Sequence, residues 1–106
     1  MIGDIVVVAP PHEYLDAGNT REFKRDVAAA VAGHTRVVLD LGRVQLLDSS
    51  ACGVLISLLR QIKGQGGDIK LCAVTRPVRA LFELVRMHKV FDIFNTRDEA
   101  VKAFQI

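Results

Sequence analysis

Hydrophobic residues recur along this chain with two alternating periods, one typical of buried strands and one typical of amphipathic helices. Continuous β-branched or apolar runs predict strands, and apolar residues three and four positions apart predict helices. The runs that predict strands are 4–9, 36–41, 69–74 and 90–94. The segments that predict helices, with their caps, are 21–31, 51–63, 75–85 and 96–104. The predicted order is therefore βαβαβαβα.

This alternation predicts an α/β fold with a largely parallel sheet, about four covering helices and right-handed crossovers. The strand at 36–41 has a continuous apolar centre, which is typical of a strand buried on both faces of a parallel sheet. The loops that follow parallel strands gather at one edge of the sheet. We therefore expect the loop at 10–16 to lie near the turn at Asp48.

Several helix boundaries are marked by residue type. Gly33 follows the first predicted helix and a glycine-rich segment, 64–67, follows the second. Thr75 is placed to cap the third helix, and Thr96 with Glu99 has the spacing of a capping box for the fourth. The buried stripe predicted for the third helix consists of Val78, Leu81, Phe82 and Val85.

Composition and charge limit the function classes. The 106 residues are half hydrophobic, which predicts one domain over residues 1–106 with a modest core. Fourteen basic and twelve acidic residues give a net charge of +2, and no cationic run indicates nucleic-acid binding. No apolar stretch is long enough for a membrane span, and the first residues lack the basic start of a signal peptide. A cytoplasmic protein is expected.

The chemically reactive side chains give no sign of a metal or cofactor site. Cys52 and Cys72 lie in apolar sequence and are expected to be buried and inert. The three histidines have no metal-ligand spacing with each other or with the cysteines. No Gly-x-Ser-x-Gly elbow surrounds Ser49, so the chain is not expected to be an enzyme.

The most informative triplet is Asp48-Ser49-Ser50, which follows an apolar run and opens the second predicted helix. Free N–H groups and the helix dipole make a helix start favourable for a phosphoryl group, which adds close to two negative charges. Ser49 could equally be an ordinary N-cap, Asp48 could cap the same helix, and Ser50 is the alternative acceptor. In the same way, Asp16 could cap the first predicted helix. Spacing alone leaves these interpretations open.

The chain also resembles the STAS-domain anti-sigma factor antagonists, in several motifs that occur in the family's order between about Leu15 and Phe104. The matching segments are Leu15-Asp16-Ala17, Val38-Leu39-Asp40-Leu41, Asp48-Ser49-Ser50, Gly53-Val54-Leu55, Gly66-Gly67-Asp68 and Thr75 to Glu83. The resemblance implies a single STAS domain.

The resemblance also implies site residues and partners. It puts the phosphoacceptor on Ser49, the loop aspartate of the family on Asp16, and the phosphosite and partner-binding neighbourhood on Asp48, Ser50 and Ala51. The unphosphorylated form would bind an anti-sigma factor that is also a GHKL-type serine kinase, and so release a sigma factor. A PP2C-type phosphatase would restore this form. A dianion beside two carboxylates would repel them and oppose docking.

The sequence departs from the family pattern at two places. Ala51 and Cys52 stand where the family commonly has Gly and Leu, and 10–13 replaces a longer strand pair. A missing edge strand would leave a sheet edge for partner pairing or a weak homodimer. An alternative function is a non-catalytic STAS adaptor subunit of a transport or other signalling assembly, in which Ser49 is never phosphorylated.

Overall fold

The computed structural model describes residues 2–105, and its elements follow the predicted alternation. The elements are β1 (Ile5–Val8), β2 (Tyr14–Leu15), α1 (Thr20–Val31), β3 (Arg36–Asp40), β4 (Leu46–Leu47), α2 (Ser49–Gly64), β5 (Asp68–Cys72), α3 (Arg76–Leu84), the 3₁₀ helix η1 (Met87–Lys89), β6 (Ile93–Phe94) and α4 (Arg97–Phe104). The predicted α/β class with four helices is confirmed. The structure adds two short strands, β2 and β4, that periodicity did not indicate.

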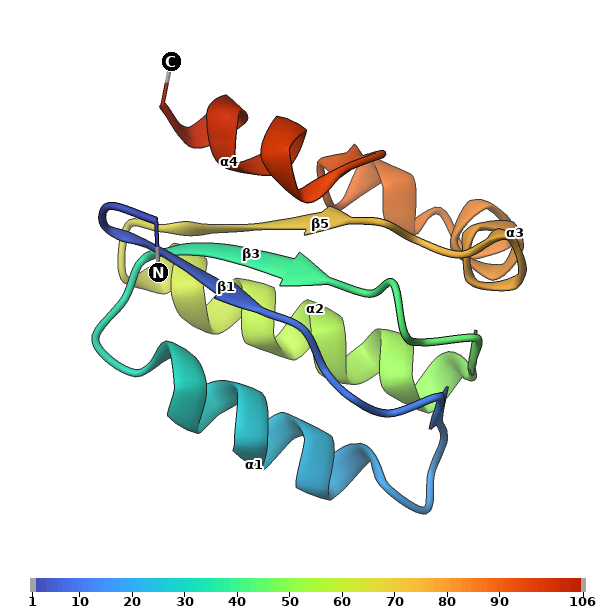
Figure 1. The fold of residues 1–106 in the computed structure, drawn as a ribbon. Coiled ribbons are helices and arrows are strands. Elements are labelled where there is room, and N and C mark those ends of the chain that lie inside the picture. The colour runs from blue at the N-terminus through green and yellow to red at the C-terminus, as the bar shows by residue number, and fades with distance from the viewer. Residues whose placement is uncertain (1, 106) are drawn as a thin grey trace.

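The main sheet has the strand order β1-β3-β5-β6, and every neighbouring pair in it is parallel. Figure 1 shows α1 and α2 on one face of this sheet and α4 on the other, with α3 beyond the carboxyl ends of the strands. The strands β1 and β6 are the two outer strands. This arrangement brings the loops that follow β1, β3 and β5 to one edge of the molecule.

The central strand β3 is buried on both faces, as its apolar sequence predicts. Val37 and Leu39 belong to the larger core cluster with α1 and α2. Val38 faces the opposite way, into a smaller cluster with Cys72 and Val101 under α4. The alternation follows from the two-residue period of a strand, and the crossovers cover both faces with helices.

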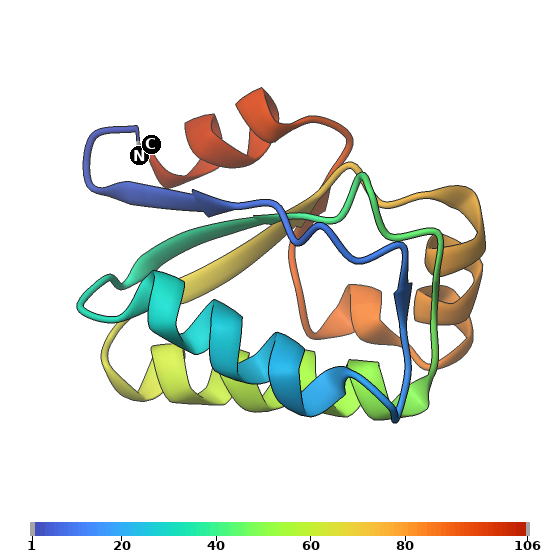
Figure 2. The ribbon, with the colours of Figure 1, turned by 60° about the horizontal axis from the view of Figure 1, so that its bottom comes forward.

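The loop at 10–16 lies beside the turn before α2, as expected. Tyr14 pairs with Leu46 and Leu15 with Leu47 in a separate two-stranded parallel sheet. Figure 2 shows β2 and β4 side by side, each leading toward the start of a long helix. The backbone N–H of Asp48 donates to the Leu15 carbonyl at 3.0 Å, so this small sheet fixes the entrance of α2.

Two predicted helix boundaries are confirmed with their physical causes. Thr96 and Glu99 form a reciprocal capping box at the start of α4. After the end of α2, Gly66 adopts the left-handed conformation with φ +84°, and a Cβ at Gly67 would overlap the carbonyl of Thr35. Thr75 does precede α3, but its hydroxyl makes no cap and instead donates to the Val44 carbonyl at 2.8 Å.

The prediction for the end of the third helix was wrong. Val85 is 43 % exposed and lies outside α3, which ends at Leu84. Arg86 adopts the left-handed conformation with φ +60°, and this turn brings Met87 into the core in place of Val85. The last strand is shorter than the predicted 90–94 and begins at Ile93, because the N–H groups of Val90 and Phe91 still bond to the Met87 carbonyl in the turn that follows η1.

Candidate functional site

The site lies at the start of α2, where Asp48 is the N-cap residue. Its backbone is extended, with φ −108° and ψ −177°, and its Oδ1 accepts a hydrogen bond from the N–H of Ala51 at 3.1 Å. The Ser50 hydroxyl donates to the same oxygen at 2.5 Å. Asp48 therefore satisfies one of the free amides of the first turn, which is the ordinary task of an N-cap.

Ser49 is the first helical residue and is exposed to solvent. Within residues 2–105 its hydroxyl forms no side-chain hydrogen bond, in contrast to that of Ser50. The alternative that Ser49 caps the helix is therefore wrong, because Asp48 has that position. The structure leaves the Ser49 hydroxyl at the positive end of a 16-residue helix with no structural task of its own.

The surroundings of Asp48 favour its charged form. The hydrogen bond from the Ser50 hydroxyl is the main cause that lowers the pKa of Asp48 below its ordinary value, and the Ala51 N–H acts in the same direction. Partial burial opposes them. At neutral pH the start of α2 therefore already carries a carboxylate beside Ser49.

The second predicted carboxylate, Asp16, lies close to the first. Asp16 and Asp48 line the same hollow of about 340 Å³. Asp16 does not cap α1, as one interpretation held, because Asn19 is the N-cap residue. The carboxylate of Asp16 instead accepts a hydrogen bond from the Gly18 N–H at 2.8 Å. The backbone N–H of Asp16 donates to Asn19 Oδ1 at 3.0 Å.

Two exposed apolar side chains in this hollow were missed by the sequence interpretation. Tyr14 is 51 % exposed and Leu46 is 53 % exposed, and both line it. They are paired residues of β2 and β4. The signal in the sequence was the Tyr14-Leu15 and Leu46-Leu47 pairs, in which one residue of each faces the core and the other cannot.

The other predicted neighbour, Ala51, is fully buried, so it acts at the surface only through its backbone N–H. Cys52 follows it into the core, as expected, and burial raises the pKa of its thiol, helped by the negative charge of Asp48. Burial also raises the pKa of Cys72 to about 11. Both thiols are held in the protonated form, which is a poor nucleophile.

The described part of the chain holds neither a candidate metal cluster nor a candidate membrane-spanning helix. In residues 2–105 no cluster of three or more His, Cys, Asp or Glu side chains has the geometry to hold a metal ion. Over the same residues, no helix combines the length and the apolar character that crossing a membrane requires.

The chain matches one known domain type. The family model described as STAS domain matches residues 2–100. BtrV of Bordetella bronchiseptica, a proposed anti-sigma factor antagonist, is 30 % identical over 103 residues, covering 96 % of this chain and 89 % of BtrV.

Solved structures agree with this result. The crystal structure of a proposed anti-sigma factor antagonist of Thermotoga maritima superposes with a TM-score of 0.92 at 26 % identity, covering 100 % of this chain and 92 % of that one. The anti-sigma factor antagonist SpoIIAA, in its unphosphorylated form, has the same fold with a TM-score of 0.77 at 19 % identity, covering 95 % of this chain and 88 % of that one.

The family match spans nearly the whole chain and includes every element that builds the Ser49 site. The protein therefore belongs to the STAS domain family, together with relatives that are named anti-sigma factor antagonists.

Proposed function

We propose that this protein is an anti-sigma factor antagonist that is switched by reversible phosphorylation of Ser49. In its unphosphorylated form it binds an anti-sigma factor, which is also a GHKL-type serine kinase, and a sigma factor is released in the cytoplasm. The kinase transfers the γ-phosphoryl group of ATP to Ser49 Oγ and releases ADP and a proton. A PP2C-type phosphatase hydrolyses the phosphoserine and restores binding.

The observation that carries this proposal is the division of tasks at the start of α2. Asp48 caps the helix, and Ser50 holds Asp48 in place. Ser49 is exposed between them. A hydroxyl that the fold does not use can gain and lose a phosphoryl group without a change in the helix, and the helix dipole favours the added negative charge.

The surface around Ser49 supports a role in protein binding. Tyr14 and Leu46 present apolar area in the hollow that Asp48, the residue before Ser49, also lines. Exposed aromatic and aliphatic side chains are typical anchors of protein interfaces. Asp16 and Asp48 line the same hollow. We assign the phosphosite and partner-binding neighbourhood to Asp16, Asp48, Ser50 and the backbone of Ala51.

The same arrangement explains how a phosphate would stop binding. The added group carries nearly two negative charges, and it would stand next to the carboxylate of Asp48 with Asp16 nearby. In the complex these charges would be desolvated together, which is costly without a new cationic partner. Repulsion would therefore be larger in the complex than in the free protein.

The relatives give independent support. The names of BtrV and of the Paenibacillus polymyxa relative describe antagonism of an anti-sigma factor, and the latter is given specifically as an anti-sigma F factor antagonist. SpoIIAA has been solved in both an unphosphorylated and a phosphorylated form.

The test is phosphorylation of the purified chain by a GHKL-type serine kinase encoded in the same genome, with ATP, followed by peptide mass spectrometry. We expect one phosphoryl group on Ser49, absent from Ser49→Ala and retained in the matched control Ser50→Ala. A PP2C-type phosphatase should remove it. Labelling of Ser50 or another residue, or no labelling by any cognate kinase, would contradict the switch and favour the non-catalytic adaptor function.

A further inference from the structure

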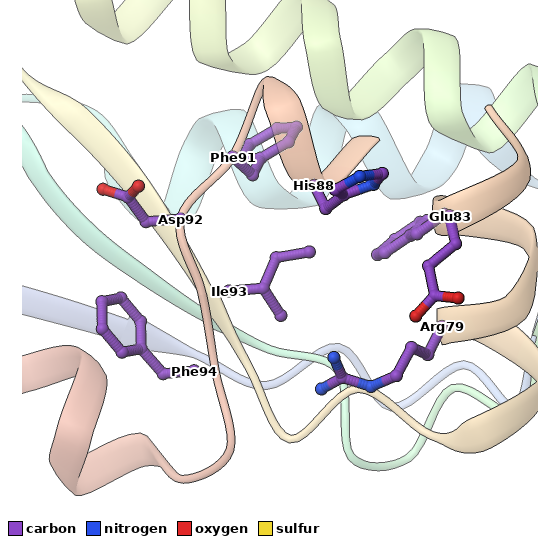
Figure 3. A pocket seen from close by; sticks show the side chains of 8 residues that line it. Arg79, Glu83, His88, Phe91, Asp92, Ile93 and Phe94 are labelled. Carbon is purple, nitrogen blue, oxygen red and sulfur yellow. The ribbon is translucent and has the colours of Figure 1, made fainter. Parts of the chain in front are cut away.

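We propose that a second surface, separate from the Ser49 site, binds an acidic segment of a partner protein that carries apolar side chains. This α3–β6 surface is a hollow of about 580 Å³ lined by Arg79, Phe82, Glu83, His88, Phe91 and Ile93. Figure 3 shows Arg79 and Ile93 pointing toward one another across it. None of these residues belongs to the Ser49 site.

The floor of the hollow is apolar. Phe82 and Phe91 are buried in the core with one side toward the hollow, and Ile93 is a half-buried residue of the outer strand β6. A volume of this size accommodates one or two large side chains of a partner. The hollow therefore suits a protruding apolar anchor.

Exposed apolar side chains also follow and precede the lining residues in the chain. Leu84 is 80 % exposed, and Val85 and Val90 are each 43 % exposed. These are three of the six large hydrophobic residues that are exposed within residues 2–105, and they lie within seven consecutive positions. Clustered exposed apolar residues of this kind mark interaction sites more often than scattered ones do.

The charge of the segment from α3 to η1, which forms one side of the hollow, selects the partner. The segment from α3 to η1 contains four cations, Arg76, Arg79, Arg86 and Lys89, but only one carboxylate, Glu83. Six ion pairs occur within residues 2–105, and none of them involves these four cations.

A second carboxylate of the hollow, that of Asp92 just before β6, already has a partner. Asp92 also lines the hollow, but its carboxylate accepts from Lys70 Nζ at 2.9 Å. The segment from α3 to η1, which supplies Arg79 to the hollow, therefore keeps an excess of positive charge. This excess complements carboxylates on a partner and steers their approach.

Shape and charge together decide between the remaining occupants. A membrane presents a flat surface, whereas the hollow is concave and suits a projecting side chain. A symmetric dimer through this surface would bring the same cations of both copies together, because a two-fold interface uses the same patch twice. An acidic protein segment meets neither obstacle.

The test uses the full chain and a short fluorescent peptide in which Glu alternates with Leu and Phe, with a second peptide that has Lys in place of every Glu. We expect saturable binding of the acidic peptide, at least about tenfold tighter than the lysine peptide. Amide shifts in the NMR spectrum of isotope-labelled protein should lie at residues 79–93 and be small at 46–50.

Matched variants locate the effect. Arg79→Glu should weaken binding of the acidic peptide at least about fivefold, whereas Arg60→Glu, at an exposed arginine of α2, should change it less than about twofold. Leu84→Ser should also weaken binding of the acidic peptide. Because Leu84 is highly exposed, this variant should fold normally, so weaker binding would not be caused by unfolding. These measurements do not involve Ser49. The phosphorylation switch can therefore be disproved while this proposal holds, and this proposal can be disproved while the switch holds.

Four results would overturn the proposal. The two peptides could bind equally or not bind below about 1 mM, or the amide shifts could map to the Ser49 site. The protein could instead sediment with phosphatidylglycerol vesicles in a way that depends on Arg79, or form a dimer in sedimentation equilibrium that Leu84→Ser abolishes.

Discussion

The first turns of α2 and α4 are built from the same positions but use them differently. In α4 the N-cap Thr96 and the third residue Glu99 bond each other's backbone. Its first residue, Arg97, donates two hydrogen bonds to the carboxylate of Asp40, at 2.9 and 3.1 Å. In α2 the N-cap is bonded, but the first residue, Ser49, is not. One entrance is fully used by the fold, while the other keeps a hydroxyl free for chemistry.

The largest effect should come from a permanent charge at the free position. Ser49→Asp should weaken binding to the cognate anti-sigma factor about 100-fold, or about 2.7 kcal/mol, because the new carboxylate is desolvated beside Asp48. Isothermal titration calorimetry measures this change. Ser49→Ala is the matched control and should bind as the unmodified chain does. Undiminished binding of Ser49→Asp would remove the basis of the switch.

The next effect compares the first turns of α2 and α4 by their contribution to the free energy of unfolding. Thr96→Ala should lower the free energy of unfolding by about 1 kcal/mol, because the Glu99 N–H loses its partner in the capping box. Ser49→Ala should stay within about 0.3 kcal/mol of the unmodified chain, since no hydrogen bond is lost. Urea unfolding followed by circular dichroism gives both values. Similar losses for the two variants would show that Ser49 has a structural task after all.

A smaller effect compares the two first helical residues directly. Arg97→Ala should lower the free energy of unfolding by about 0.5 kcal/mol, a small value because the arginine is half exposed and screened by solvent. The loss should shrink as salt is added, since ions screen the pair with Asp40. Thermal unfolding at low and high ionic strength checks both statements, and a loss independent of salt would point to packing instead.

The smallest effect is a dependence on pH at the start of α2. The pKa of Asp48 in the folded chain is lowered, first of all by the Ser50 hydroxyl. A lowered folded-state pKa adds stability that is present above the unfolded-state pKa, near 3.8 for Asp, and that is lost as pH falls through the folded value.

Ser50→Ala should therefore lose less stability than the unmodified chain between pH 6 and pH 3, because its Asp48 titrates closer to the ordinary value. Urea unfolding at the two pH values measures the difference. The same pH dependence in both proteins would mean that the Ser50 hydrogen bond is not formed in solution.

Most of the fold could be predicted because each long helix or strand has a recognisable pattern of apolar or capping residues. The apolar run of β3, the helical spacing in α2 and the Thr96-Glu99 spacing each had a single plausible structural interpretation. The only signal of β2 and β4 was one apolar pair in each, and two residues are too few to show a period. The burial of Met87 depended on the left-handed turn at Arg86, and arginine gives no signal for that conformation.

The position of the candidate site was predicted more completely than its details. The sequence located Ser49 at a helix start, but it could not decide whether Asp48 or a serine was the cap. That choice depends on which side-chain oxygen reaches the Ala51 N–H. Nor could it show that Tyr14 and Leu46 are both exposed in one hollow, since they are 32 positions apart in the chain and meet only through the β2–β4 pairing.

The place of Ser49 in the helix also affects how a modifying enzyme reaches it. The N–H of a first helical residue has no acceptor within the helix. Local fraying at Ser49 therefore breaks at most the one helical hydrogen bond that the Ser49 carbonyl accepts. Farther along, Leu55 and Leu59 anchor the helix in the core. A catalytic cleft can therefore draw out one residue as a substrate while the rest of the protein remains folded.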